Sequence, residues 1–302
     1  MNSETKSVLP TYAALVMIWA LTPLAIVWSV SEIPRLWSLV LRFFMALPLV
    51  LLIVAVLRVK VPLTISALHS YLAGSFSLIV SQTFTYLATS YLSSGMIALM
   101  FGFAPIVAGL IAFGLYRQRL SGNQWLGMGV AICGLYTISV AGEETHISIT
   151  GLLLMLGALL TYATSIFWVK HINARVSPIA QAAGSITVST LMAVCMLPFI
   201  WSDAPQALPG PRSMLAIGYL VVGASIVAMF CYFKLVQKVS ATTLSLATVL
   251  TPMLAICFGI VLNDEPFRIN ILIGSALVIG GLGMYFYRDL RNLRAERSVI
   301  RD

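Results

Sequence analysis

One basic residue stands well inside a long apolar stretch of the chain. Arg42 lies in the apolar run 36–57, nearer to its start than to its end. A guanidinium keeps its proton at physiological pH, and a charge surrounded by hydrocarbon is costly unless it pairs, reaches water or faces a wet cavity. We therefore keep three roles open for Arg42: reaching the nearest interface, an ion pair with Glu265 or Glu32, or contact with an anionic group of a ligand.

Aromatic and small polar residues in other apolar runs could form a ligand pocket around such a charge. Ligand pockets are mostly apolar and aromatic, with a few placed polar groups. The candidates are Trp19, Tyr86, Phe101, Tyr162, Trp168 and Tyr232 among the aromatic residues and Gln82, Ser165 and Ser245 among the polar ones. The alternative for each aromatic residue is a place in a lipid-facing belt.

The residue types that usually carry catalysis are not clustered in these runs. His69, His146 and His171 lie at the ends of apolar runs, and no Asp or Glu falls inside any run. The four cysteines form no CxxC pair, and the chain contains no GxxxxGK[ST] motif. We therefore expect neither an enzyme nor a cofactor or metal site. Glu265 is expected to cap the last helix or to pair with Arg268, with a coupling role near the outer mouth as the alternative.

The composition indicates the kind of elements that hold these residues. Of the 302 residues 60% are apolar and 9% charged, with a mean hydropathy of +0.97, whereas soluble domains contain about 25% charged residues. A membrane-spanning helix needs about 20 mainly apolar residues. Ten such runs are expected, at 8–28, 36–57, 68–90, 93–116, 123–141, 149–169, 178–200, 213–234, 240–262 and 270–287.

The basic residues indicate the orientation of these spans. The net charge of +8 could point to nucleic acid, but in a membrane chain the side on which Lys and Arg lie carries the information. With a cytoplasmic N-terminus, fourteen of them fall on inner segments and only Arg35, Arg212 and Arg268 on outer loops. We expect a multi-pass protein of a bacterial inner membrane with both termini in the cytoplasm, and no nucleic-acid partner.

Matching landmarks recur along the chain at one fixed offset. Pro105 and Pro252 differ by 147 in residue number, and so do Gly127 and Gly274, and Gly134 and Gly281. Each half holds five expected helices, an odd number, so the second copy would enter the membrane from the opposite side. The expected fold is an all-α membrane protein of ten helices in two inverted five-helix repeats, at 1–141 and 149–288, followed by a basic cytoplasmic tail at 289–302.

Two residue types within the repeats predict packing and bending. Pro105 and Pro252 are expected near the middle of their spans, as hinges beside a cavity or as purely structural kinks. The glycines near Gly127, Gly134, Gly274 and Gly281 let helices approach closely. We expect them to form a packed scaffold in a monomer, with a homodimer interface as the weaker alternative.

These landmarks in their order resemble the EamA-type members of the drug/metabolite transporter superfamily. The resemblance rests on Trp19-Ala20, Arg42-Phe43, Ala98, Pro105, Gly127, Gly134, Ser245, Pro252, Asn263-Asp264-Glu265-Pro266, Gly274 and Gly281, and it covers nearly the whole chain. Gln118 departs from the Glu usual in the family, and Trp19-Ala20 departs from the commoner Trp-Gly. The resemblance implies export of amino acids, other metabolites or drug-like compounds.

The residues and the resemblance together predict a secondary transporter embedded in the lipid bilayer. It would export a small amphipathic metabolite, such as an amino acid, by alternating access. The alternatives are a proton-coupled multidrug efflux carrier, a channel, and a membrane assembly subunit. Proton-coupled efflux of cations usually relies on an embedded carboxylate, which the expected spans lack.

Overall fold

The computed structural model describes residues 3–117, 120–140, 148–238, 241–265 and 269–287. For some of these, including 3–7 and 241–246, only the backbone is described. Within the described residues every regular element is a helix. The expected basic tail at 289–302 and most of the junction between the expected repeats lie outside the described residues.

The helices follow one another with short connections. In chain order they are α1 (Ser3–Ser29), α2 (Arg35–Val56), α3 (Ile65–Ser75), η1 (Phe76–Val80), α4 (Ser81–Ala88), α5 (Ser94–Gly102), α6 (Ala104–Tyr116), α7 (Gly122–Val140), α8 (Ile149–Ile172), α9 (Pro178–Ile200), η2 (Trp201–Asp203), α10 (Pro211–Tyr219), η3 (Leu220–Val227), α11 (Ala228–Lys238), α12 (Ala241–Asn263) and α13 (Ile269–Tyr285). The elements α3, η1 and α4 run on without a break, as do α10, η3 and α11. Every apolar run expected from the sequence falls on a helix in the described part of the chain.

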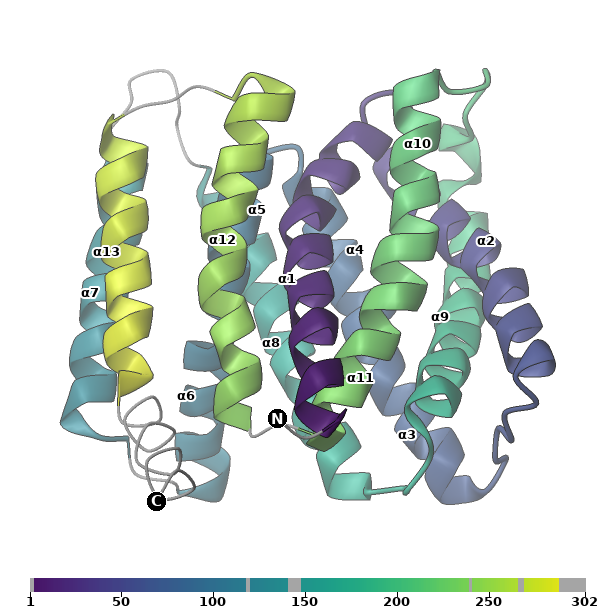
Figure 1. Cartoon of the computed structure of the whole chain (residues 1–302). Coiled ribbons are helices and arrows are strands. Elements are labelled where there is room, and N and C mark those ends of the chain that lie inside the picture. The colour runs from purple at the N-terminus through teal and green to yellow at the C-terminus, as the bar shows by residue number, and fades with distance from the viewer. Residues whose placement is uncertain (1–2, 118–119, 141–147, 239–240, 266–268, 288–302) are drawn as a thin grey trace.

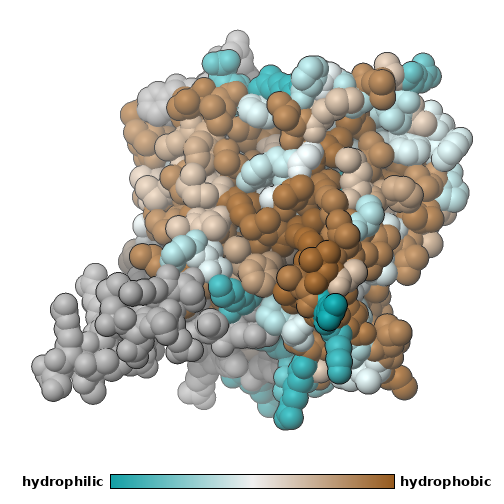
Figure 2. Space-filling view, turned by 45° about the vertical axis from the view of Figure 1, so that its right-hand side comes forward, coloured by the Kyte–Doolittle hydropathy of each residue, from teal (hydrophilic) through white to brown (hydrophobic). Residues whose placement is uncertain are grey.

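The surface of the helical bundle is that of a multi-pass membrane protein. Six helices of the described chain are long and apolar enough to cross a membrane: Val8–Ser29, Arg35–Val56, Ser94–Gly114, Ile149–Ile172, Pro178–Asp203 and Pro211–Tyr232. Two shorter apolar helices cover Leu250–Asn263 and Leu272–Tyr285. Figure 2 shows an apolar band with hydrophilic residues gathered above and below it. Large apolar patches of this kind are rare on soluble monomers and fit contact with lipid.

Two helices pack side by side at one edge of the molecule through glycine (Figure 1). A Cβ added to Gly127 of α7 would lie 2.4 Å from the carbonyl oxygen of Gly281 of α13, and one added to Gly134 would lie 2.6 Å from that of Gly274. Only residues without a side chain permit backbones to approach this closely. From Gly127 to Gly134 the residue number rises along α7, while the contacted residue on α13 falls from Gly281 to Gly274. The two helices are therefore antiparallel.

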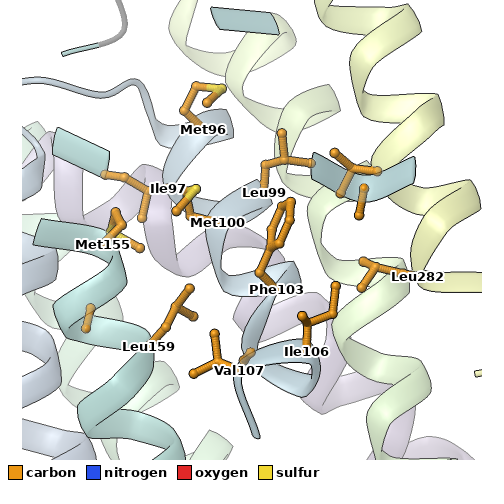
Figure 3. Packing of buried hydrophobic residues seen from close by; sticks show 14 of the residues in the cluster. Met96, Ile97, Leu99, Met100, Phe103, Ile106, Val107, Met155, Leu159 and Leu282 are labelled. Carbon is orange, nitrogen blue, oxygen red and sulfur yellow. The ribbon is translucent and has the colours of Figure 1, made fainter. Parts of the chain in front are cut away.

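The segment formed by α5 and α6 lies between this glycine-packed pair and α8 (Figure 3). Met155 and Leu159 of α8 face it from one side, and Leu282 of α13 faces it from the other. Ile97 and Leu99, both fully buried, belong to the same apolar cluster. Helix α5 is thereby fixed between elements that are distant in sequence.

The two prolines expected at equivalent positions act differently on their helices. Proline lacks an N–H and its ring clashes with the carbonyl four residues earlier. The helix is interrupted at Phe103, and Pro105 is the second residue of α6. Pro252 instead lies inside the continuous α12. Pro105 nevertheless lies near the middle of the apolar span Ser94–Gly114, as expected, and the hinge role of both prolines stays a prediction.

Candidate substrate cavity

A cavity of about 120 Å³ lies among α1, α2, η1, α4, α5, the start of α6, α8, η3, α11 and α12. A water molecule needs about 10–15 Å³ of such space, so the cavity has room for a small organic molecule. Its lining consists of Trp19, Thr22, Pro23, Ile26, Arg42, Ser77, Leu78, Gln82, Ile97, Ala98, Phe101, Gly102, Ala104, Tyr162, Ala224, Met229, Thr251 and Pro252.

The charged group at this cavity is the guanidinium of Arg42. Its residue is only 3% exposed, and its Nε donates to Ser225 Oγ over 2.9 Å while Nη1 donates to Gln82 Oε1 over 3.3 Å. No described residue accepts a hydrogen bond from Nη2. The guanidinium therefore lies at the cavity. The side chains that bind it there are neutral, and neither is Glu265 or Glu32.

Aromatic side chains form a second part of the cavity surroundings. The rings of Phe101 and Tyr162 meet edge to face, with centroids 6.3 Å apart. The rings of Trp19 and Tyr232 are tilted, with centroids 5.6 Å apart, and the hydroxyls of Tyr162 and Tyr232 form a hydrogen bond. We call Trp19, Phe101, Tyr162 and Tyr232 the aromatic wall. Tyr232 is not part of the described lining, but it contacts Trp19 and Tyr162, which are.

Two helical segments with π-helical hydrogen bonding carry lining residues on the other side. In η3 the hydroxyl of Ser225 donates to Leu220 O over 2.9 Å, five residues earlier. The π-helix η1 carries Ser77 and Leu78 into the lining. Such π-helical turns are rare and are frequently found at functional sites. Here the turn in η3 presents Ser225 to Arg42.

The structure brings only part of the expected site together. Of the ten expected binding residues, Trp19, Arg42, Gln82, Phe101 and Tyr162 line the cavity, and Tyr232 contacts that lining. Tyr86 is fully buried in an apolar cluster and does not line the cavity. Ser165 donates to Ala73 O over 2.7 Å, and Trp168 packs edge to face on Phe76. The side chain of Ser245 lies outside the described residues.

A polar network joins helix ends on the face where α5 begins and α12 ends. Asn263 Oδ1 accepts from Trp28 Nε1 over 2.7 Å and from Arg212 Nη2 over 3.0 Å. Glu265 accepts from the Ser94 hydroxyl and from the backbone N–H groups of Ser94 and Gly95. Glu265 therefore caps the N-terminus of α5, where a carboxylate is favoured. The expected cap of the last helix stays a prediction, because residues 266–268 lie outside the described part of the chain. Arg268, its other expected partner, lies outside the described residues.

Comparison with known proteins identifies the family. The model of the EamA-like transporter family matches residues 9–140 and, a second time, residues 149–287. The chain belongs to the EamA-like transporter family. It is therefore a membrane transporter. The relatives of this EamA-like chain are also named as transporters.

Relatives of this EamA-like transporter come from bacteria and archaea. The "Uncharacterized inner membrane transporter YedA" of Escherichia coli K12 is 25% identical over 295 residues, which cover 93% of this chain and 94% of YedA. An "Uncharacterized transporter" of Archaeoglobus fulgidus is 24% identical over 278 residues, covering 90% and 95%. A match to the transporter YvbV of Bacillus subtilis, 24% identical, spans 63% of this chain and 62% of YvbV.

A solved structure shares the fold of this EamA-like transporter. It is described only as "Crystal structure of protein", superposes with a TM-score of 0.66 and covers 92% of this chain and 96% of its own. The sequence identity is 18%, so the likeness concerns the fold alone.

The cavity of this EamA-like transporter takes lining residues in pairs from the two matched segments. Ser77 and Ala224, Gln82 and Met229, and Ala104 and Thr251 all line it, and the members of each pair differ by 147 in residue number. Sequence reasoning missed all of these except Gln82. Applying the offset of the proline and glycine landmarks to Gln82 would have found Met229. Nothing in the sequence marked Ser225 as a partner of Arg42.

Proposed function

We propose that this membrane transporter is a secondary carrier that exports a small amphipathic metabolite, such as an amino acid, without catalysing a reaction. The observation that carries the proposal is the cavity lined by both matched segments, with one buried cation and an aromatic wall. Binding sites of secondary transporters typically lie where two repeats meet near the bilayer midplane.

The proposed mechanism is alternating access between two inverted five-helix repeats, at 1–141 and 149–288. The antiparallel contact of α7 and α13 supports this arrangement. Gly127 meets Gly281 and Gly134 meets Gly274. Moving 147 residues forward from Gly127 gives Gly274 and moving 147 residues back from Gly281 gives Gly134, so the second contact is the first with the two repeats exchanged. A two-fold relation in which equivalent helices run in opposite directions produces this pattern.

The proposed location is the inner membrane of a bacterium, with both termini in the cytoplasm. The excess of Lys and Arg on one set of connections supports this orientation, and the name of the relative YedA, an inner membrane transporter, supports the choice of membrane. In Figure 1 the start of α1 and the end of α13 lie at the same face of the bundle, as the proposed topology requires. The proposed functional unit is the monomer.

Export of cationic drugs is the second candidate function, and the charge of the cavity disfavours it. Arg42 repels a cation, and no carboxylate belongs to the described lining. A channel or an assembly subunit would not need a cavity with lining from both matched segments. Counterflow separates these cases, since only a carrier exchanges substrate across the membrane in a saturable way.

The decisive experiment is counterflow in proteoliposomes loaded with a panel of amino acids, with variants of the aromatic wall. Trp19→Ala and Tyr162→Ala should each lower the exchange rate of a transported amino acid at least tenfold, because each removes a ring that lines the cavity. The matched control is Tyr136→Ala on α7, whose side chain is 68% exposed. It should exchange at the rate of the unaltered protein.

Two results would contradict the proposal. Unchanged exchange in both Trp19→Ala and Tyr162→Ala would reject the cavity as the substrate site. A protein-dependent flux that rises linearly with concentration and shows no counterflow would indicate a channel.

A further inference from the structure

The charge balance of the cavity narrows the class of substrate. Of the described residues that line it, Arg42 alone carries a formal charge, and its hydrogen-bond partners Ser225 and Gln82 are neutral. A buried charge without a countercharge is unfavourable. The described lining therefore supplies no countercharge to Arg42, and an anionic ligand would supply one.

The free edge of the guanidinium has the geometry for a carboxylate. The two hydrogen bonds engage Nε and one hydrogen of Nη1, and no acceptor for Nη2 is found among the described residues. Nη2 and the second hydrogen of Nη1 are left to donate, and a guanidinium that donates two N–H groups matches the two oxygens of a carboxylate. Ser225 and Gln82 fix the guanidinium in place, so little side-chain entropy remains to be lost on binding.

The rest of the described lining offers no carboxylate to a positively charged group. The hydroxyls of Thr22 and Thr251 donate to backbone carbonyls of their own helices, and the Oε1 of Gln82 already accepts from Arg42. An ammonium group would meet these neutral oxygens and the repulsion of Arg42. The aromatic wall, by contrast, suits an apolar body.

We propose that the cavity binds a monovalent organic anion, with its carboxylate on Arg42 and a compact apolar or aromatic body on the aromatic wall. This inference rests on the proposed carrier function and narrows its substrate from amphipathic metabolites in general to anions. A zwitterionic amino acid with the same body binds more weakly, because its ammonium group finds no countercharge.

The same charge gives a driving force for export. The Arg42 guanidinium keeps its proton in the empty and the loaded protein, and no Asp or Glu lies inside the apolar runs to bring a proton along. Each transported anion therefore carries its charge across the membrane. A membrane potential that is negative inside drives anions outward, whichever way the protein itself is inserted.

The test uses three ligands that share a phenyl group and a short chain. In proteoliposomes of the full chain, 3-phenylpropionate carries charge −1, phenylalanine is zwitterionic and phenethylamine carries +1. Counterflow of 3-phenylpropionate, after subtraction of protein-free liposomes, should be at least tenfold faster than that of the other two. A potassium gradient with valinomycin should drive its accumulation on the positive side, with reversal when the gradient is reversed. An accumulation ratio of about 50 corresponds to about 100 mV.

Variants of the arginine assign the selectivity to its side chain. Arg42→Gln should lose at least tenfold of the 3-phenylpropionate exchange, and Arg42→Lys should retain the charge preference with a raised KM, since lysine lacks the planar fork. The matched control is Arg35→Gln, which removes the same charge from an exposed position on the same helix. It should exchange within twofold of the unaltered protein. The unaltered protein alone gives the ligand ranking, so the test does not depend on the folding of Arg42→Gln.

Each contrary result identifies what has failed. Faster exchange of phenylalanine or phenethylamine, or full exchange by Arg42→Gln, overturns the anion inference and leaves the carrier function standing. Exchange of 3-phenylpropionate that follows a pH gradient and ignores the potential overturns the charge-carrying step. Absence of exchange for all three ligands also overturns the anion inference, and the amino-acid panel described above then decides the carrier function separately.

Discussion

At the scale of single residues, the position of a charge decides its role more than its type does. Arg42 and Arg212 are both arginines beside aromatic rings: Arg42 over Phe43 at 5.6 Å and Arg212 over Trp28 at 4.3 Å. Arg42 is buried at the cavity, whereas Arg212 joins the polar network at the helix ends. Arg42 thus lines a space that a ligand could fill.

Glu265 gives a prediction at this scale. Glu265→Gln should lower the stability of the protein by about 1–3 kcal/mol, because hydrogen bonds to an ionised acceptor are stronger than those to an amide. Its carboxylate accepts two backbone N–H groups of α5 and the Ser94 hydroxyl. Thermal unfolding of the purified protein in detergent measures the change.

The matched control is the neighbouring residue. Asp264→Asn removes the same charge from an exposed side chain, at a backbone φ of 50° that asparagine tolerates. It should leave the melting temperature unchanged. Equal melting temperatures for Glu265→Gln and the unaltered protein would mean that the cap contributes nothing measurable.

At the scale of elements, glycine and proline have effects that depend on their neighbours. Gly127, Gly134, Gly274 and Gly281 permit the close contact of α7 with α13. Gly280 stands next to one of them in the sequence but has no atom within 4 Å of an added Cβ in the described structure. The same residue type is therefore a packing requirement at one position and dispensable at the next.

This difference predicts the outcome of two alanine substitutions. Gly281→Ala should destabilise the protein, because the new methyl would lie 2.5 Å from the carbonyl oxygen of Gly127 and 2.6 Å from the backbone nitrogen of Ala131, which forces the helices apart. Gly280→Ala should cost nothing, since alanine favours a helix more than glycine does. Melting temperatures and yields of the monodisperse protein compare the two. A loss in Gly280→Ala as large as that in Gly281→Ala would reject the contact.

At the scale of the whole molecule, the proposed topology puts loops on defined sides of the membrane. Asp203 follows α9, and Lys60 lies between α2 and α3 at the other end of the bundle (Figure 1). Both side chains are exposed. The orientation inferred from the basic residues assigns Asp203 to the outside and Lys60 to the cytoplasm.

Cysteine labelling of intact cells tests this assignment. Asp203→Cys should react with a membrane-impermeant maleimide, whereas Lys60→Cys should react only after the cells are permeabilised. The unaltered protein supplies the background of the native cysteines. The opposite labelling pattern would invert the orientation, and labelling of both positions from outside would contradict the alternation of the helices.

The helices, and the two segments in which they recur, follow from the amino-acid sequence. Their positions depend on local apolar runs of membrane length, so the expected ranges fall on helices in the described chain. The offset of 147 is likewise a property of the sequence. Five of the ten binding residues expected from the sequence line the cavity. Residues such as Arg42 and Trp19 could be recognised because an arginine or a tryptophan is unusual in an apolar run.

Which helix faces meet, and which partners the polar groups find, depends on contacts between residues that are far apart in the sequence. Ser225 is 183 residues from Arg42, and the N-terminus of α5 is 171 residues from Glu265. Tyr86, Ser165 and Trp168 lie in similar apolar runs but do not line the cavity. In α8, which carries Ser165 and Trp168, apolar residues lie on every side, so no stripe of polarity marks the inner face. Inter-helix packing must therefore select it.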